Sequence, residues 1–498
     1  MVPLAGVKLL LHLLVNARTV YGFHRDELLY LAMGRHLQLW RMDFPPGIAL
    51  LAEAVRAVLG DSLLAIRMLP ALAGTALLVL AALIAREFGG GRWAQALAGL
   101  GVLASPLFLR SANLFQPVVF DQLAWTAALY ALVRLCREPR PRWWLVLGLA
   151  LGVGLLVKFS AAFLAAGLLL AMLVTRWRAW LATPWPWLAA GIAFAIGSPS
   201  LAGQIRLDYP VLGQMADLRQ TQLERVTPLA FFAGQFLWGP AAWIGLLGLG
   251  GLLAGRDLRT FRIVGVTAGA VLLILTALHG KSYYAGPLYP TLLAGGATMI
   301  AQVGGIRLGP ALRWGTVALL VVTMAALLPL GVPLLGPPRM ARYAQAIGAT
   351  SALRTNTGEL ERLPQDYADM VGWESQARAV ARVYHALPPA DRARAIILGA
   401  NYGEAGALDL FGPRLGLPGV VSPAGSFWFF GPGKLPGEVV VVIGATREDL
   451  TPMFRSVEPA LRVLSEWSVA EERDLTIYVA RGPRHTLQEV WPSLAGRN

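Results

Sequence analysis

Three acidic residues stand close together in a segment that directly follows the first apolar run of the chain. Asp26 and Glu27 lie beside His24, and Asp43 precedes two prolines, in the segment "YGFHRDELLYLAMGRHLQLWRMDFPPG" (21–47). A carboxylate can remove a proton from an attacking hydroxyl, and carboxylates with histidine can bind a divalent cation. An acidic pair at the start of a helix is also favoured by the helix dipole alone. The surroundings of the pair therefore decide between these interpretations.

The composition indicates a membrane protein. Of 498 residues, 56% are hydrophobic and only 14% are charged, and the mean hydropathy is positive, which a soluble globular chain would not show. The net charge of +14 comes almost wholly from arginine, because lysine occurs only four times. Arginines in short loops determine how a membrane protein is oriented, so a nucleic-acid partner is not needed to explain the positive charge. The single cysteine, Cys136, excludes an internal disulfide.

Apolar runs long enough to cross a bilayer, about 20 residues each, recur through the first two thirds of the chain. They predict about eleven transmembrane helices, at roughly 1–20, 62–85, 93–110, 117–134, 143–157, 159–175, 186–203, 229–254, 263–279, 287–303 and 314–336. Short arginine-bearing connections alternate with less basic ones, so the positive-inside rule places the N-terminus in the cytoplasm. The first loop, 21–61, and the tail after residue 336 are then extracytoplasmic.

The C-terminal part, 337–498, is predicted to be a soluble extracytoplasmic α/β domain. It holds 17 of the 29 acidic residues. Its runs "RAIILGA" (394–400), "EVVVVIGA" (438–445) and "LTIYVA" (475–480) are typical of strands. No glycine-rich dinucleotide fingerprint follows them, which argues against a Rossmann-type cofactor site. The predicted organisation is a transmembrane catalytic domain over 1–336 followed by this small domain.

The first helix carries a polar face. Lys8, His12 and Asn16 recur at four-residue intervals, which places them on one side of a helix. Polar side chains in a membrane helix face the protein interior, so this side is expected to pack into the bundle. No small-residue cleavage site follows, and the segment is expected to remain as an uncleaved span.

The first outer loop is predicted to contain a helix that lies in the membrane interface. Glu27, Tyr30, Gly34, Gln38 and Arg41 recur at three- or four-residue spacing, with leucines between them. The two prolines after Asp43 are expected to stop this helix before the next one begins. For Asp43, the alternative to a role in the chemistry is that of an ordinary turn residue.

Further charged residues are expected near the outer membrane boundary. Asp121 lies inside the predicted span "PVVFDQLAW", where an ionisable group is costly unless it faces a polar cavity. Lys158 and Lys281 occupy predicted outer helix ends, where snorkelling to the interface is the alternative explanation. Carboxylates, compact cations and aromatic residues at this boundary suit group transfer from a lipid-linked phosphate. The cations stabilise the departing phosphate and a carboxylate accepts the proton of the attacking hydroxyl.

Seven stretches of the chain carry a resemblance to a known family: "FHRDELLYLAMGRHL", "MDFPPGIALL", "QPVVFDQLAW", "LLVKFSAAF", "GKSYYAGPLYPTLLAGGA", "NYGEAGALDLFG" and "SFWFFGPG". The sequence resembles the membrane-embedded GT-C-type glycosyltransferases, in particular the family-39-like group related to protein O-mannosyltransferases and lipid A aminoarabinose transferases. The stretches are spread over most of the chain. The resemblance implies a polytopic helical GT-C fold.

The resemblance also implies roles for individual residues. Asp26 matches the catalytic base, Glu27 a residue that supports the base or contacts acceptor or metal, and Asp121 a second acid near the donor phosphate. These three acids are also the candidates for binding a divalent cation such as Mg, Mn or Zn. The other candidate substrate-binding residues are His24, Tyr30, Asp43, Lys158, Lys281, Tyr283 and Tyr284. Where the aminoarabinose branch has a lysine beside its proline, this chain has Asp43-Phe44-Pro45, so that branch's sugar and acceptor are not assumed.

The predicted function is an inverting glycosyltransferase. It would move a hexose or pentose from a polyprenyl-phosphate donor to a hydroxyl of a protein, lipid or cell-envelope glycan, at the outer face of the bacterial cytoplasmic membrane. Two other classes stay open at this stage. One is a polytopic transporter or lipid flippase, with the polar residues of the spans lining a path. The other is a metal-dependent lipid-phosphate transferase or hydrolase that uses the acids of the first loop.

Two motifs of the tail have alternative explanations. Glu404 in "NYGEAGALDLFG" follows a predicted strand and opens a predicted helix, so it is expected either to cap that helix or to face an acceptor. The aromatic residues of "SFWFFGPG" (426–433) would suit stacking on a sugar.

Overall fold

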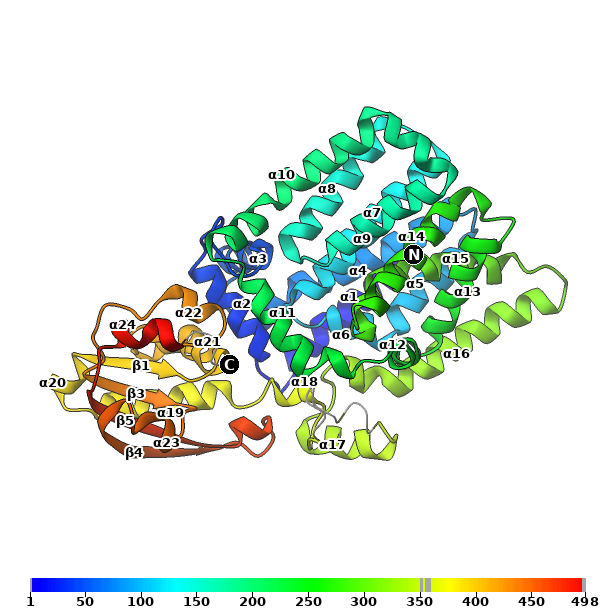
Figure 1. Ribbon diagram of the computed structural model, residues 1–498. Helices are drawn as coiled ribbons and strands as arrows, with labels where there is room; N and C mark the ends of the chain where they lie inside the picture. Colours follow the sequence, from blue (N-terminus) through cyan, green and yellow to red (C-terminus); the bar gives the residue numbers. More distant parts are fainter. Residues whose placement is uncertain (1, 350–352, 354–359, 495–498) are drawn as a thin grey trace. The chain divides into compact units, whose positions relative to one another are not determined.

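The chain divides into two compact units. The computed structural model describes residues 2–349, 353 and 360–494 (Figure 1). Unit 1 comprises Met1–Arg18, Leu39–Gly47 and Leu64–Leu334, and unit 2 comprises Thr19–Gln38, Ile48–Leu63 and Leu335–Asn498. By packing, most of the first loop therefore groups with the C-terminal segment. The predicted boundary at residue 336 separates a transmembrane part from an extracytoplasmic part, and it stays a prediction.

Unit 1 is built from helices. Several of them begin with a proline in the first turn, where the missing N–H has no partner to lose. The α-helices are α1 Val2–Arg18, α4 Leu63–Glu87, α5 Arg92–Ala104, α6 Pro106–Ser111, α7 Pro117–Arg137, α8 Pro141–Val157, α9 Ala161–Val174, α10 Pro184–Arg206, α11 Pro210–Thr221, α12 Pro228–Gln235, α13 Pro240–Ala254, α14 Arg262–Ala277, α15 Tyr289–Gln302 and α16 Leu308–Gly331. The 3₁₀ helices are η1 Arg176–Ala182, η2 Leu223–Arg225, η3 Phe236–Trp238, η4 Arg259–Phe261 and η5 Ser282–Leu288.

Several of these helices are suited to a bilayer. Within the described residues, five helices are long and apolar enough to span a membrane, or up to seven if each of two bent helix pairs counts as one span. The five are Leu63–Glu87, Pro117–Arg137, Pro184–Arg206, Arg259–Ala277 and Leu308–Gly331. The predicted polytopic helical part is confirmed, whereas the number of about eleven spans stays a prediction.

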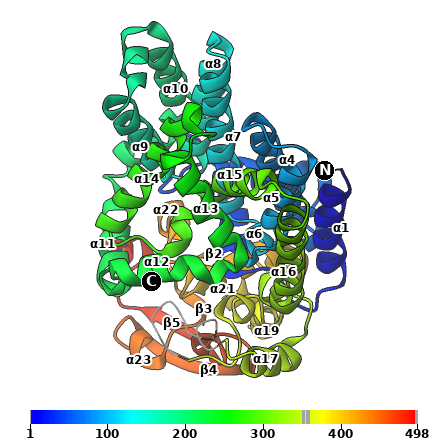
Figure 2. The same cartoon turned by 90° about the vertical axis from the view of Figure 1, so that its right-hand side faces the viewer.

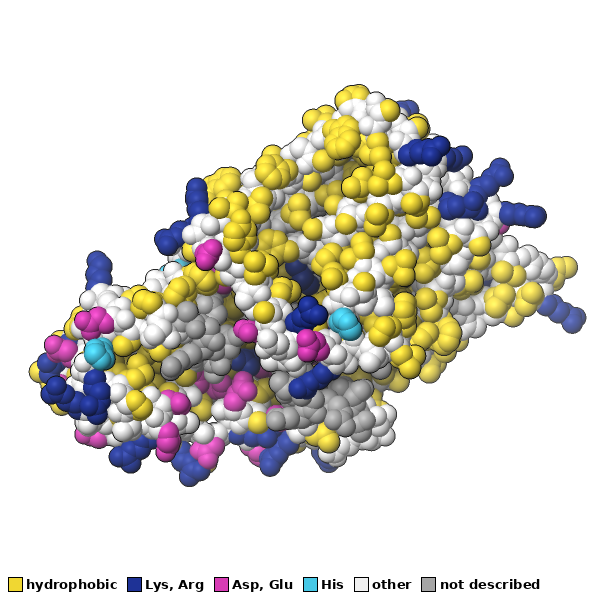
Figure 3. All heavy atoms as spheres, viewed as in Figure 1, with side chains coloured by type: hydrophobic (Ala, Val, Ile, Leu, Met, Phe, Trp, Pro, Cys, Tyr) yellow, Lys and Arg dark blue, Asp and Glu magenta, His cyan; other side chains and the backbone are white. Residues whose placement is uncertain are grey.

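The surface of unit 1 is apolar over its helices. Large hydrophobic side chains are exposed along α8 (Leu145, Leu149), α10 (Phe194) and α16 (Leu319, Val322). Figure 3 shows hydrophobic side chains covering the helices of this unit on the face in view, with Lys and Arg along one edge. A contiguous exposed apolar surface of this kind is expected where lipid covers it.

The polar face of α1 packs inward, as predicted. The side chains of Lys8 and His12 are completely buried, and Asn16 is nearly so. The Lys8 ammonium donates to the Phe108 carbonyl at 3.1 Å, and the Asn16 amide donates to Asn113 Oδ1 at 3.1 Å. His12 Nδ1 lies 3.4 Å from the same oxygen. Each of these three side chains thus has a polar contact with the segment around α6.

Close helix contacts in unit 1 depend on glycine. Helices α13 and α15 run side by side (Figures 1 and 2). Gly248 of α13 faces the Leu292 carbonyl, and Gly296 of α15 faces the Ile244 carbonyl, so closely that an added Cβ would collide with each oxygen. Without a side chain, the two backbones can approach and pack without an aqueous driving force.

Unit 2 combines helices with the small sheet that the sequence predicts. Its α-helices are α2 Arg25–Arg35, α3 Gly47–Leu59, α17 Pro337–Ala346, α18 Gln365–Ala368, α19 Trp373–Ala386, α20 Pro389–Arg392, α21 Tyr402–Phe411, α22 Ser426–Phe430, α23 Arg447–Leu450 and α24 Leu487–Val490. The 3₁₀ helices are η6 Gly412–Leu415, η7 Ala470–Glu472 and η8 Trp491–Leu494.

The sheet has five strands in the order β2-β1-β3-β5-β4. They are β1 Ala395–Gly399, β2 Val420–Val421, β3 Val439–Ile443, β4 Phe454–Leu464 and β5 Asp474–Pro483. Strands β2, β1 and β3 are parallel, and β5 is antiparallel to both β3 and β4. The "VVVVI" run of β3 is buried throughout, as expected for a central strand covered on both faces. The three predicted strands correspond to β1, β3 and β5.

The helix of the first loop is shorter than the spacing predicts. Helix α2 ends at Arg35, whereas the pattern extended to Arg41. The His36 N–H makes the last helical bond, to the Ala32 carbonyl, and the next N–H, of Leu37, donates to Gly34 in a tighter turn. Gly34 packs against Ala52 of α3, and α2 also packs on α21. Protein contacts on both sides explain why leucines occur around the whole helix and not on a single stripe.

The glycine contact of α13 allows a matched test. We expect Gly248→Ala to destabilise the protein by about 1 to 3 kcal/mol, since the new methyl must push the Leu292 carbonyl away. Gly250→Ala on the same helix should be neutral or slightly stabilising, because nothing lies within 4 Å of its Cβ position. Thermal unfolding of the two purified variants in detergent measures the difference. Equal unfolding midpoints would contradict the packing described here.

Candidate active site

The start of α2 is fixed by a reciprocal cap. His24 Nδ1 accepts the backbone N–H of Asp26 at 3.1 Å, and Glu27 Oε2 accepts the backbone N–H of His24 at 2.8 Å. These bonds satisfy donors that a helix start leaves without partners. Glu27 is completely buried, whereas the Asp26 side chain is 32% exposed. The cap therefore turns Glu27 inward and leaves the Asp26 side chain partly exposed.

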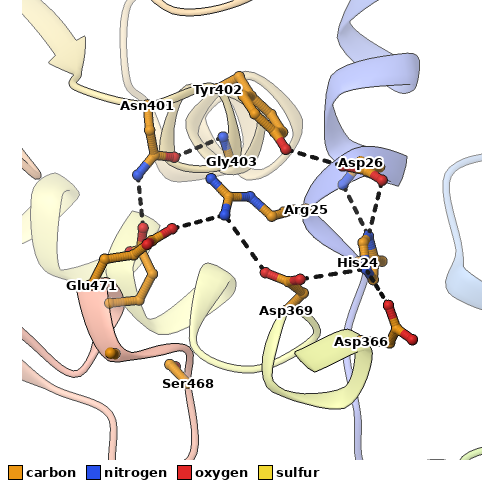
Figure 4. A network of polar contacts seen from close by, with 12 residues as sticks. His24, Arg25, Asp26, Asp366, Asp369, Asn401, Tyr402, Gly403, Ser468 and Glu471 are labelled. Carbon is orange, nitrogen blue, oxygen red and sulfur yellow. Dashed lines mark hydrogen bonds and ion pairs between the residues drawn. The ribbon is translucent and has the colours of Figure 1, made fainter. Parts of the chain in front are cut away.

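His24 lies buried among aspartates. Since Nδ1 accepts a backbone N–H, the ring proton is assigned to Nε2. Nε2 lies 3.7 Å from Asp369 Oδ2 and 3.9 Å from Asp366 Oδ1. The ring thus links the start of α2 to the segment around α18 (Figure 4). Its position suits orientation of Asp26 more than direct contact with a substrate, because only 4% of the side chain is exposed.

Asp26 is held by a tyrosine from the C-terminal segment. The Tyr402 hydroxyl donates to Asp26 Oδ1 at 3.1 Å (Figure 4). Burial and the nearby Asp26 charge raise the pKa of Tyr402 above its ordinary value, so it remains a donor. The Arg25 guanidinium lies over the Tyr402 ring at 4.6 Å and pairs with Glu471 at 2.8 Å. The Tyr402 hydroxyl and the Arg25 charge thus both stabilise the Asp26 carboxylate.

Tyr402 is itself positioned by a second cap. Asn401 Oδ1 accepts the N–H groups of Gly403 and Glu404, and Glu404 Oε2 accepts the Asn401 N–H at 3.1 Å. The predicted capping role of Glu404 is confirmed. Asn401 also donates to Glu472 at 2.7 Å. Glu404 and Glu472 are both buried, and burial together with the Glu472 charge raises the pKa of Glu404 to about 8.

A second cluster, in unit 1, brings together four of the predicted residues. Asp121 on α7 is buried, and its Oδ2 accepts the Ser160 hydroxyl at 2.8 Å. Lys158 follows α8 and interacts electrostatically with Asp121. The Lys158 ammonium lies 5.7 and 5.5 Å from the ring centroids of Tyr283 and Tyr284. This arrangement presents a cation beside two phenols, which suits recognition of a phosphate.

The remaining predicted residues lie outside these two clusters. Lys281 donates to Gln222 Oε1 at 2.5 Å, and the Asp43 backbone carbonyl accepts from Gln204 at 2.5 Å; all four are in unit 1. Tyr30 is half-buried on α2 in unit 2. The backbone contact of Asp43 is compatible with the turn role considered above.

Some site residues were absent from the prediction. Tyr402 and Ser160 lie in motifs that the sequence had already marked, but only the fold shows what they contact. Asp366 and Asp369 carry no local signal, because their importance comes from the contact of α18 with the first loop.

The metal prediction stays untested. Within the described residues, no group of three or more His, Cys, Asp and Glu side chains has an arrangement that could hold a metal ion. Asp26 and Glu27 belong to unit 2 and Asp121 to unit 1. We therefore derive no catalytic step through a divalent cation.

The "SFWFFGPG" motif is largely used in packing. Trp428 donates to the Trp491 carbonyl and accepts from Trp491 in return, both at 3.0 Å. The Phe430 ring stacks on His36 with centroids 4.3 Å apart. Sugar stacking by this motif stays a prediction.

Comparison with known proteins relates this architecture to a class of enzymes. Residues 43–202 match the family described as dolichyl-phosphate-mannose-protein mannosyltransferase. The solved structure of ArnT from Cupriavidus metallidurans bound to undecaprenyl phosphate has 16% identity and a TM-score of 0.63, covering 100% of this chain and 99% of ArnT. Its apo structure has 17% identity and a TM-score of 0.62, with the same coverage. The comparison with curated protein sequences gives no match.

A more distant structure is an oligosaccharyltransferase from Archaeoglobus fulgidus, at 13% identity and a TM-score of 0.49, covering 89% of this chain and 68% of that one. The predicted resemblance is confirmed: the chain has the fold of the GT-C-type membrane glycosyltransferases and is a multi-pass membrane protein. Within that class, its fold matches that of ArnT over essentially the whole of both chains.

The buried carboxyl pair of unit 2 predicts a pH dependence. Because the pKa of Glu404 is raised from 4.5 to about 8 in the folded state, its contribution to stability is complete below about pH 4.5 and is lost as the pH rises to about 8. Glu404→Gln keeps the cap acceptor but cannot ionise. We expect its unfolding midpoint to exceed that of the unsubstituted protein at pH 8.5 and to equal it at pH 4.

The matched control is Glu466→Gln, since that side chain is 64% exposed in the same unit. Across this pH range, the unfolding midpoint of the control should equal that of the unsubstituted protein. A Glu404→Gln profile parallel to that of the unsubstituted protein would contradict the prediction.

Proposed function

We propose that this protein is an inverting glycosyltransferase that moves a sugar from a polyprenyl phosphate to a hydroxyl acceptor. The observation that carries the proposal is the geometry of Asp26, a partly exposed carboxylate at a capped helix start that accepts the Tyr402 hydroxyl at 3.1 Å. The GT-C fold and the mannosyltransferase family match support the reaction class. The ArnT structure bound to undecaprenyl phosphate supports a lipid-phosphate donor.

The proposed reaction is a single displacement. Asp26 accepts the proton of the acceptor hydroxyl as the oxygen attacks the anomeric carbon of the sugar. The bond between that carbon and the phosphate oxygen breaks, and the polyprenyl phosphate departs with the bonding electrons. Attack from the side opposite the leaving group inverts the anomeric configuration. Asp26 then returns its proton to solvent.

Tyr402 and His24 have supporting roles in this proposal. The Tyr402 hydroxyl fixes the Asp26 carboxylate through Oδ1, and the side chain stays 32% exposed. The capping bond to His24 Nδ1 fixes the backbone of Asp26. A base held in one orientation reacts faster, because less conformational entropy is lost on the way to the transition state.

The cluster of unit 1 is proposed to bind the donor phosphate. Lys158, together with Lys281 from outside the cluster, would offset the charge that the phosphate gains as it leaves. Tyr283 and Tyr284 lie beside the Lys158 ammonium and add hydroxyl donors. Asp121, bonded to Ser160, would hold Lys158 in place through their electrostatic interaction.

The proposed location is the outer face of the bacterial cytoplasmic membrane. The arginine-rich connections support a cytoplasmic N-terminus, which leaves the first loop and residues 337–498 outside. There a lipid donor is available from the bilayer and a polar acceptor from the envelope. The sugar is proposed to be a hexose or a pentose, and the acceptor a protein, lipid or envelope glycan.

Asp26→Asn tests the assignment of the base. We expect the rate of sugar transfer to fall by at least about a hundredfold, because the amide cannot accept the acceptor proton. Glu53→Gln, on α3 of the same unit and 53% exposed, is the control and should retain activity. Transfer is measured with purified, folded protein and a labelled polyprenyl-phosphate sugar. Full activity of Asp26→Asn would refute the assignment.

Lys281→Ala tests the donor site. We expect a roughly five- to tenfold higher apparent KM for the lipid donor and a smaller change in kcat, since one phosphate-binding cation is lost. Lys434→Ala is the control, because this exposed lysine lies in unit 2. An unchanged donor KM, or an equal effect in the control, would remove Lys281 from the donor site.

A further inference from the structure

A basic depression lies at one end of the helices of unit 1, where α4 and α7 end. Glu87 is buried there, and its carboxylate pairs with Arg134 and Arg137 at 3.0 Å each and with Arg86 at 3.5 Å. These residues and Glu138 line a cavity of about 510 Å³. A single buried carboxylate thus gathers three guanidinium groups around one opening.

The arginines exceed the acids that pair with them. Besides the three at Glu87, Arg140 and Arg142 both pair with Glu138. Five arginines against two glutamates leave three positive charges in excess. The side chains of Arg86, Arg137 and Arg142 are 55 to 56% exposed. Guanidinium donors therefore remain available at the rim, and their planar geometry matches a phosphate.

An apolar track leads away from this depression along α8. Arg142, Leu145, Leu149 and Val153 follow one another at spacings of three or four residues, which places them on one face of the helix. The three apolar side chains are 43%, 51% and 40% exposed. A molecule whose anionic group lies at the arginines can thus place its apolar chains along this exposed hydrophobic surface.

Tryptophans mark the same end of the unit as a membrane boundary. The ring of Trp143 lies under Arg134 and Arg142, at 4.6 and 5.2 Å from the two guanidinium carbons. Trp144 packs on Trp180, and Trp93 packs on Trp314. Half of the 16 tryptophans of the chain lie in the segments that meet here: Trp93, Trp143, Trp144, Trp177, Trp180, Trp185, Trp187 and Trp314. Tryptophan is enriched at the headgroup level of bilayers.

We propose that this arginine site binds the phosphodiester headgroup of an anionic phospholipid, with the acyl chains along α8. The excess charge selects an anionic headgroup over a zwitterionic one, and the exposed apolar track selects a lipid over a soluble phosphate. The site uses side chains of unit 1 that have no part in the proposed transfer reaction. It would hold the protein in membrane regions rich in acidic lipid.

The test uses the purified full-length protein, stripped of lipid in detergent and titrated with phosphatidylglycerol or phosphatidylcholine. Binding is measured by native mass spectrometry and by the shift of the thermal unfolding midpoint. We expect phosphatidylglycerol to bind and stabilise the protein at lower concentration than phosphatidylcholine, with an effect that weakens as NaCl is raised. Inorganic phosphate at equal concentration should not reproduce the stabilisation or displace the lipid.

Two substitutions make the test site-specific. Arg137→Gln should weaken phosphatidylglycerol binding about fivefold, as expected for the loss of one cation at a lipid headgroup. Arg256→Gln is the control, because it removes the same charge from the connection between α13 and α14 at the same end but outside the cavity. Arg86→Gln serves as a second variant if Arg137→Gln proves unstable without lipid.

Three results would overturn the proposal. The first is equal binding of the anionic and zwitterionic lipids. The second is an equal loss in Arg137→Gln or Arg86→Gln and in the Arg256→Gln control, which would indicate a diffuse charge effect. The third is displacement of the lipid by inorganic phosphate, which would identify a soluble-anion site.

Discussion

A polar side chain within a bilayer must find its partner inside the protein, and this constraint organises unit 1. Lys8, fully buried on α1, donates to the Phe108 carbonyl. Asn16 donates to Asn113 and accepts from Arg67, which is also fully buried. Each of these contacts fixes α1 against a neighbouring segment, because leaving such a group without a partner in hydrocarbon would cost roughly several kcal/mol. The glycine contacts then set how closely the helices approach.

The candidate base depends on a different and more local device. The bonds between His24 and the first turn of α2 fix the direction of Asp26 before any substrate binds. A second cap, at Asn401, places Tyr402 against the same carboxylate. Two capped helix starts, separated by more than 370 residues in the chain, thus hold one carboxylate within a single packed unit. Pre-organisation of this kind suits a base that must accept a proton from a bound hydroxyl.

Local patterns were sufficient for part of this structure. The four-residue spacing on α1 identified its buried face, and apolar runs identified β1, β3 and β5. Strand β4 was not predicted, because Pro459 and several charges interrupt its pattern at a sheet edge, where a strand tolerates both. The acidic pair was visible in the sequence, but Tyr402, which donates to Asp26, is brought to it by tertiary packing alone.

The central claim is that a sugar leaves a polyprenyl phosphate for a hydroxyl acceptor. Its most direct test follows the unsubstituted, purified protein with a labelled polyprenyl-phosphate sugar, with and without acceptor, and measures free polyprenyl phosphate and the anomeric configuration of the product. The account predicts that release requires the acceptor, equals the amount of glycosylated acceptor and yields the inverted anomer. Release at the same rate without acceptor, or a product that retains the donor configuration, would contradict it.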